Sequence, residues 1–107
     1  MVVVFAKCDV IEGKGETFKE LAHGLAEKSR QEEKNVSYDI LTEPQDEGNK
    51  YYFLEKWQDQ EGLGLHMKKD YFIHTIEAVN HIIHGELEIH VYETVSRKRI
   101  HQVLERE

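Results

Sequence analysis

The sequence is short of cysteine and of long hydrophobic runs. Its single cysteine, Cys8, cannot form an intramolecular disulfide, so the cysteine content gives no indication of an oxidising compartment. The apolar start, MVVVFAKCDV, has no basic region and no small-residue cleavage site, and it is too short for a signal peptide or a membrane span. We therefore expect a cytoplasmic protein that does not bind membranes.

Positive charge is scarce as well. The chain has 14 Lys and Arg residues against 21 Asp and Glu residues, which gives a net charge of -7 with histidine neutral. This balance argues against a nucleic-acid partner, because binding to a phosphate backbone depends on Lys and Arg. The sequence also lacks a glycine loop of the type that cradles phosphates, and it lacks a closed set of metal ligands. We therefore expect no flavin, haem or metal cofactor.

The patterns that are present describe one domain followed by a short tail. A chain of 107 residues with 39% hydrophobic and 33% charged residues is typical of a globular domain rather than a disordered segment. We place the domain at residues 1–95 and a charged tail at 96–107. In this tail basic SRKRIH is followed at once by acidic LERE, a pattern typical of a solvated segment.

Hydrophobic periodicity predicts the elements of this domain. Alternating residues predict strands at 2–10, 35–42, 51–57 and 86–95. An apolar stripe predicts a helix from Glu16 to about Glu33, and a second helix is predicted in two pieces, one capped by Asp59 and one starting near Asp70 and stopped by Gly85. The order β-α-β-β-α-β indicates an α+β, ferredoxin-like fold, in which helices cover one face of a four-stranded antiparallel sheet.

The face of the sheet away from the helices also carries apolar side chains. They are Val3, Phe5, Tyr52, Leu54 and Tyr92. An uncovered patch of this kind would be adhesive on a monomer in water. We therefore expect a homodimer in which a second copy of the chain covers this face.

An ordered set of motifs resembles the antibiotic biosynthesis monooxygenase domain. The set consists of VIEGKGETFKELA after the first strand, VSYDIL before the hairpin, and FLEKW followed by a helical histidine and KKDYF. The resemblance covers roughly residues 2–95 and implies a dimeric α+β barrel with a pocket between sheet and helices in each subunit. Members of the family include cofactor-free monooxygenases of polycyclic or quinol aromatics, haem-degrading enzymes and an isomerase of a phosphorylated signal. The resemblance therefore supports the fold more strongly than it supports any one reaction.

The sequence departs from the family pattern in three places. A glycine often closes the first helix, and here Lys34 or Asn35 is expected to take that turn. Gly62 and Gly64 replace good helix formers, which indicates either a weak helix that opens over a pocket or close packing of helix and sheet. The first strand has no asparagine and His74 falls too early for the haem-degrading members, so haem degradation is not expected.

The candidate site combines one strand face with one helix face. His66 is the expected general base, because histidine has the right unperturbed pKa near neutral pH, and Tyr38 is the next catalytic candidate. Trp57 is expected to line the same cavity and stack on a ligand ring; the plainer interpretation is a core tryptophan beside a buried histidine. The expected substrate-binding residues are Trp57, Phe53, Glu55, Met67 and Phe72. For Glu55, pairing with a neighbouring lysine is the plainer alternative.

These residues and the resemblance together predict a cofactor-independent monooxygenase that oxidises a small quinol or polyphenol-like aromatic with O2. Two alternatives stay open: an isomerase or lyase acting on a small phosphorylated metabolite, and a non-catalytic dimeric binder of small molecules. The expected apolar lining disfavours the first alternative. The spacing of His74, His81 and His84 leaves a metal site as a further interpretation, and Cys8 is expected to pack inside the sheet.

Overall fold

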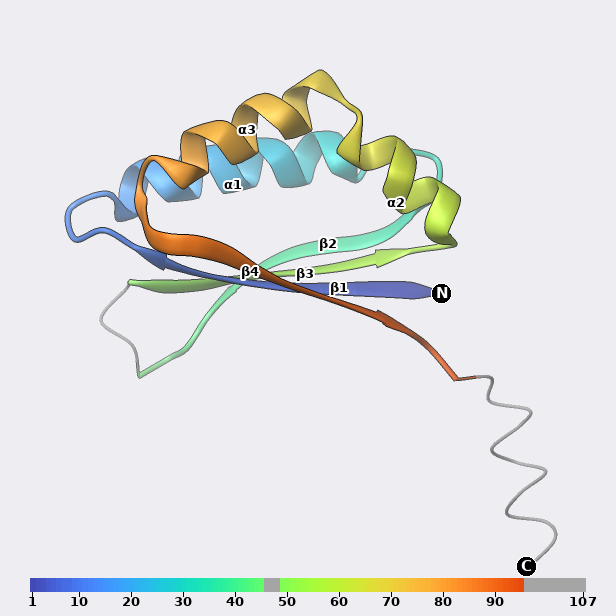
Figure 1. Ribbon diagram of the computed structural model, residues 1–107, viewed down its shortest axis with the longest axis horizontal. Coiled ribbons are helices and arrows are strands. Elements are labelled where there is room, and N and C mark those ends of the chain that lie inside the picture. The colour runs from blue at the N-terminus through green and yellow to red at the C-terminus, as the bar shows by residue number, and fades with distance from the viewer. Residues whose placement is uncertain (46–48, 96–107) are drawn as a thin grey trace, which may run out of the picture.

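The computed structural model describes residues 1–45 and 49–95, which fold into one layer of strands and one layer of helices (Figure 1). The elements in chain order are β1 (Val2–Val10), α1 (Gly15–Ser29), β2 (Asn35–Thr42), β3 (Lys50–Trp57), α2 (Gln60–Met67), α3 (Asp70–Asn80) and β4 (Ile83–Glu93). The expected α+β, ferredoxin-like arrangement is confirmed, with its second helix divided into α2 and α3. The tail expected at 96–107 lies outside the described residues.

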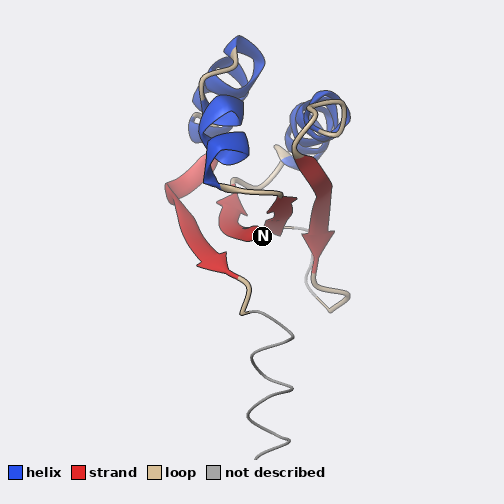
Figure 2. Cartoon of the chain, turned by 90° about the vertical axis from the view of Figure 1, so that its right-hand side faces the viewer, coloured by secondary structure: helices blue, strands red, loops and turns tan. Residues whose placement is uncertain are grey.

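The described strands form an antiparallel sheet in the order β2-β3-β1-β4. β1 pairs with β3 on one side and with β4 on the other, so it lies inside the sheet, as its sequence predicts. Alternate residues of β1, from Val2 to Val10, are buried beneath the helices. Figure 2 shows the helices together on one side of the twisted sheet, while the opposite side of the sheet is uncovered in the single chain.

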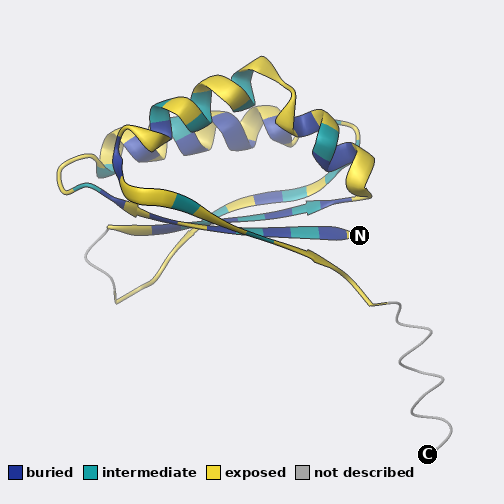
Figure 3. Cartoon of the chain, in the orientation of Figure 1, coloured by how far each residue is buried: buried dark blue, intermediate teal, exposed yellow. Residues whose placement is uncertain are grey.

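α1 is held on the sheet by an apolar stripe, which Figure 3 shows as the dark face turned toward the strands. The buried residues of this stripe are Phe18, Ala22, Leu25, Ala26 and Ser29. The Phe18 ring lies 4.5 Å from the Tyr51 ring and 5.8 Å from the Phe53 ring, centroid to centroid. Full burial of one such side chain contributes about 1.5–3 kcal/mol, so Phe18 helps to hold the helix over β3.

The end of α1 differs from the prediction. The helix ends at Ser29, whose hydroxyl donates to the Leu25 carbonyl at 2.6 Å, and no described residue other than glycine has a positive φ. Tight turns continue the chain instead: the amide of Glu32 donates to the Ser29 carbonyl at 3.0 Å, and the amide of Asn35 donates to the Glu32 carbonyl at 3.1 Å. Neither Lys34 nor Asn35 therefore takes a left-handed turn, and Glu32 is brought under the helix layer.

Gly85 also differs from the prediction, since α3 already ends at Asn80 and Gly85 lies within β4. Its φ of 65° belongs to the left-handed region that glycine tolerates best. The pairing of β1 with β4 shifts in register between Lys7 and Asp9, opposite this glycine. Gly85 thus permits an irregularity in the edge strand rather than a helix stop.

α2 begins at the expected cap. The Asp59 side chain accepts from the Gly62 amide at 2.8 Å, and Lys34 reaches the Asp59 carboxylate at 2.9 Å and the Glu61 carboxylate at 3.3 Å. A Cβ at Gly62 would lie only 2.6 Å from the Cβ of Lys34, whereas one at Gly64 would meet no atom of the described chain within 4 Å. Close packing therefore accounts for Gly62 but not for Gly64.

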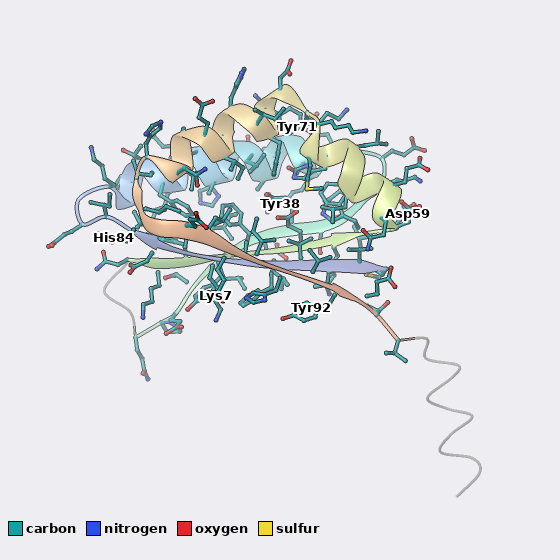
Figure 4. The ribbon with its side chains drawn as sticks, in the orientation of Figure 1. Lys7, Tyr38, Asp59, Tyr71, His84 and Tyr92 are labelled. Atoms are coloured by element: carbon teal, nitrogen blue, oxygen red, sulfur yellow. The ribbon has the colours of Figure 1, made fainter. Side chains whose placement is uncertain are left out.

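The uncovered sheet face carries the apolar side chains that the sequence places there. Phe5 and Tyr52 stack with their ring centroids 5.5 Å apart, and Tyr92 is 55% exposed. Figure 4 shows Tyr92 and Lys7 directed away from the helices. Among the described helices, none has the length and apolar character needed to cross a membrane.

Candidate active site

A small cavity of about 70 Å³ lies between the sheet and the helix layer. Most of its wall is apolar and comes from β1, α3 and β4, and the polar side chains among its described lining residues are Tyr38, Glu55 and His66. A cavity of this size holds several water molecules, while ligand pockets usually measure ~300–1,000 Å³. The lining residues Met67 on α2 and Ile89 on β4 are 49% and 55% exposed, so the cavity can widen at this side.

His66 is the innermost polar group of the cavity. Its side chain projects from α2, is 0% exposed, and is surrounded by aromatic rings, with Trp57 4.5 Å and Phe72 4.8 Å away between centroids. Its Nδ1 lies 2.8 Å from Oε2 of Glu32. Burial lowers the pKa of the imidazole, although the hydrogen bond and charge of Glu32 act in the opposite direction. His66 is therefore a neutral imidazole at pH 7.

Nε2 of His66 is directed at the second buried carboxylate, that of Glu55. The atom lies 3.9 Å from Oε1 of Glu55, which is too far for a hydrogen bond, and it finds no other partner within the described part of the chain. Buried polar atoms are nearly always paired, so this unpaired nitrogen beside a cavity indicates a place for a ligand.

Glu55 is held in place by two neutral donors. Trp57 Nε1 donates to Oε1 of Glu55 at 3.0 Å, and the Tyr38 hydroxyl also hydrogen-bonds this carboxylate. Burial raises the pKa of Glu55 to about 7, against the lowering effect of these two donors, and the charge of Glu32 raises it further. Burial and the nearby Glu55 raise the pKa of Tyr38 well above its usual value, so Tyr38 keeps its proton and donates.

The structure brings together most, but not all, of the residues expected at the site. The cavity is lined by six of them: His66, Tyr38, Phe53, Glu55, Met67 and Phe72. Trp57 is fully buried behind the His66 ring and does not line this cavity; it lies instead beside a separate hollow between Lys34, Gly62 and Lys69. The expected lysine pairing of Glu55 is also wrong, because the partners of Glu55 are Trp57 and Tyr38.

Two polar residues of the site were not anticipated from the sequence. Glu32 lies outside the apolar stripe of the predicted helix, yet its side chain is only 11% exposed and contacts His66. Tyr71 on α3 donates its hydroxyl to the same Oε2 of Glu32, and its label in Figure 4 lies within the helix layer. Glu32 and His66 are 34 positions apart, and no local pattern joins them.

The histidine cluster does not form a metal site. In residues 1–45 and 49–95 no three His, Cys, Asp or Glu side chains lie close enough to hold a metal ion. His74 lies on α3, His81 follows its end, and His84 lies in β4, so the turn between helix and strand separates them. Cys8 is buried in the sheet as expected, and burial raises the pKa of its thiol to about 12.

Comparison with known proteins places this arrangement in a family. The family model "Antibiotic biosynthesis monooxygenase" matches residues 1–78, which include Glu32, Tyr38, Glu55 and His66. The chain belongs to the antibiotic biosynthesis monooxygenase family. The resemblance of the sequence motifs is thereby confirmed.

Other proteins are similar to this member of the antibiotic biosynthesis monooxygenase family in sequence and in fold. "Putative monooxygenase YcnE" of Bacillus subtilis (strain 168) is 36% identical over 72 residues, which cover 67% of this chain and 75% of the relative. A conserved protein from Methanosarcina mazei Go1 is 26% identical, with a TM-score of 0.84 over 88% of this chain and 92% of its own. "Putative antibiotic biosynthesis monooxygenase from Nitrosomonas europaea" shares the fold at 21% identity, with a TM-score of 0.84 over 90% of this chain and all of its own. Family and relatives support a monooxygenase-like function.

Proposed function

We propose that the protein is a cofactor-independent monooxygenase that oxidises a small quinol or polyphenol-like aromatic with O2. The observation that carries the proposal is the buried, unpaired Nε2 of His66, which lies beside Glu55 in an otherwise apolar cavity. A neutral imidazole with a free nitrogen is suited to accept a proton near pH 7. The apolar walls suit the ring of the substrate, which would displace the water molecules that the cavity can hold.

The reaction needs no oxidant other than O2. A phenolic hydroxyl of the substrate gives its proton to Nε2 of His66, and the ring becomes electron-rich enough to pass one electron to O2. The two radicals join in a carbon–oxygen bond. Cleavage of the O–O bond leaves one oxygen atom on the ring as a carbonyl and releases the other as water, which contains two hydrogens from the substrate. The electrons come from the substrate, so the residues supply only the base, the orientation and the apolar surroundings.

His66 is a better candidate for the base than Tyr38. The raised pKa of Tyr38 keeps its hydroxyl protonated, and that hydroxyl is engaged with Glu55. We assign Tyr38 and Glu55 to the polar end of the cavity, where a substrate hydroxyl is held beside Nε2. Phe53, Met67 and Phe72 would contact the substrate ring, and Trp57 would support His66 from behind.

The charge of the cavity disfavours a phosphorylated metabolite as substrate. No Lys or Arg is found among the described lining residues, whereas Glu55 is. A phosphate group there would be desolvated next to a carboxylate without a cation to compensate it. An isomerase or lyase acting on such a metabolite is therefore the weaker proposal.

Oxygen uptake with a panel of quinols and polyphenols tests the proposal. The wild-type protein should consume O2, and in ¹⁸O2 the product should carry one labelled oxygen atom. His66→Ala should lower turnover by ~10²-fold or more, the usual effect of losing a general base, while substrate binding changes little. His23→Ala, which removes an exposed histidine of α1, should leave turnover unchanged.

Two outcomes would contradict the proposal. Binding of quinols without oxygen uptake would leave a non-catalytic binder as the function. A folded His66→Ala variant with wild-type turnover would exclude His66 as the base.

A further inference from the structure

We propose that Glu32 is a positioning residue that holds the His66 imidazole with its proton on Nδ1, so that the cavity recognises ligands through a hydroxyl that still carries its hydrogen. The proposal deepens the monooxygenase function above, and its effect on turnover rests on that function. Its structural part concerns the proton on His66 and is tested without turnover.

The fold places Glu32 at the ring for reasons unrelated to any local sequence pattern. α1 ends at Ser29, and the tight turns that follow direct the Glu32 side chain inward toward α2 and α3. There Oε2 of Glu32 receives the Tyr71 hydroxyl and lies 2.8 Å from Nδ1 of His66. A carboxylate with only 11% of its side chain exposed needs such donors, because burial removes its hydration.

The hydrogen-bond chemistry fixes the proton. An ionised carboxylate only accepts hydrogen bonds, so the contact with Glu32 requires a hydrogen on Nδ1 of His66. A neutral imidazole has a single N–H, and Nε2 therefore carries the lone pair. This nitrogen lies at the cavity wall, is fully buried, and is unpaired among the described residues.

The ligand class follows from the polarity of the cavity end. Above about pH 7, where Glu55 is ionised, Nε2 of His66 and the carboxylate of Glu55 present two acceptors 3.9 Å apart. A neutral hydroxyl or a similar donor group satisfies them, while a carboxylate or phosphate would face acceptors on both sides. The site therefore selects the protonated form of a phenol and removes its proton only after binding. Anionic analogues of the same ring should be rejected.

The protonation state of His66 can be read directly by NMR. Long-range ¹H–¹⁵N spectra of the labelled wild-type protein at about pH 8, where imidazoles are neutral, should show a protonated Nδ1 and an unprotonated Nε2 for His66. The opposite assignment would overturn the proposal. This measurement uses the wild-type chain, so it does not depend on any variant folding.

A pair of charge-removing variants tests the role of the carboxylate. Glu32→Gln should make the tautomer mixed and lower kcat by ~10-fold or more, a part of the ~10²–10⁴-fold that a general base contributes, with KM little changed. The acid limb of the pH profile should move to lower pH, because Glu32 raises the pKa of His66. Glu33→Gln, the same change at the exposed neighbouring position, should alter neither tautomer nor pH profile.

The pH profile must be interpreted with every group that acts on His66. Glu32 comes from the turn after α1, Glu55 from β3 lies 3.9 Å from Nε2, and the charge of Lys69, between α2 and α3, lowers the pKa of the imidazole. Tyr38 from β2 packs with its ring centroid 5.8 Å from that of His66. Of the two charge-removing variants, only Glu32→Gln should change both the tautomer of His66 and the acid limb of the pH profile. An unchanged tautomer and an unchanged limb in a folded Glu32→Gln variant would overturn the positioning role.

Ligand selection is tested by binding alone at about pH 8, where Glu55 is ionised, with phenol and benzoate as probes. The two share one ring and differ in offering a hydroxyl donor or a carboxylate. Phenol should bind at least ~10-fold more tightly, since burying an unpaired charge is unfavourable. Equal binding of benzoate would refute the ligand class. If the tautomer and the selectivity are as expected but no quinol is oxidised, the monooxygenase proposal fails while the role of Glu32 in binding stands.

Discussion

The site depends on individual carboxylates that are buried without a cation. Glu32 and Glu55 lie on either side of the His66 ring, and each is stabilised by neutral donors: Tyr71 for Glu32, and Trp57 with Tyr38 for Glu55. Donors of this kind offset only part of the cost of burying charge. For Glu55 this cost appears as a raised pKa, and shifted pKa values concentrate where proton transfer takes place.

Glu55 should make stability depend on pH in a defined window. Its pKa is about 7 in the folded chain and 4.5 without the fold, so between these values the folded state keeps a proton that the unfolded state has lost. The contribution of Glu55 to the free energy of unfolding of the wild type is therefore fully present below about pH 4.5 and is lost as pH rises through 7. Glu55→Gln lacks this dependence, so its free energy of unfolding relative to that of wild type should rise by up to about 3 kcal/mol as pH increases from 4.5 to 7.

Urea denaturation at a series of pH values measures this difference. A lost hydrogen bond in the amide variant would displace its stability by a constant amount but would not change the slope. Glu33→Gln, at an exposed position, should follow the wild-type curve throughout. A difference between Glu55→Gln and wild type that stays constant from pH 4.5 to 7 would show that Glu55 titrates normally.

At the scale of elements, α2 determines where His66 lies. It is a short helix, Gln60–Met67, and isolated helices of this length are unstable in water, so the Asp59 cap and packing against Lys34 must hold it. α2 therefore depends on tertiary contacts more than on its own residues. A helix that is stable only through such contacts can move when a ligand widens the cavity.

The two glycines of α2 should respond in opposite directions to the same substitution. Gly64→Ala should raise the free energy of unfolding by about 1 kcal/mol, because alanine is the better helix former and the space beside Gly64 is open to the described chain. Gly62→Ala should lower it by roughly 1–3 kcal/mol, because the new Cβ would meet Lys34 Cβ at 2.6 Å. Chemical denaturation measures both, and each variant serves as the control for the other. Stabilisation by Gly62→Ala would contradict the packing account.

At the scale of the whole molecule, the uncovered sheet face supports a homodimer. Val3, Phe5, Tyr52 and Leu54 are partly exposed there in the single chain, and Tyr92 is mostly exposed. Contiguous apolar surface on the outside of a small protein is typical of an association site. We propose that the sheets of two copies pack against each other through this face.

Leu54→Glu should dissociate this dimer. Leu54 pairs in register with Phe5 of β1 and with Asp39 of β2, so a glutamate there would be buried in the interface without a partner. Sedimentation at micromolar concentration should give a dimer for wild type and a monomer for the variant. Leu65→Glu makes the same change at an exposed site on α2 and should leave the dimer intact. A wild-type monomer under these conditions would exclude the shared barrel.

The sequence by itself determined the order of elements, the central position of β1 and the two apolar faces of the sheet. These features follow from the spacing of hydrophobic residues, which is two in strands and three to four in helices. This spacing is local, so it can be recognised in a single sequence. The same periods put Phe53 and Glu55 on one strand face and His66 on the helix above them. The ordered motifs then indicated the family.

Only the tertiary structure decided which partners these residues have. The contact of Glu32 with His66 joins positions 34 apart, through a helix that ends earlier than its apolar stripe predicts. Trp57 shares its strand face with Glu55, yet it does not line the cavity, because the His66 ring of α2 packs against it. Periodicity specifies the face on which a side chain lies. The packing of one element over another specifies whether that side chain meets a ligand, a carboxylate or the core.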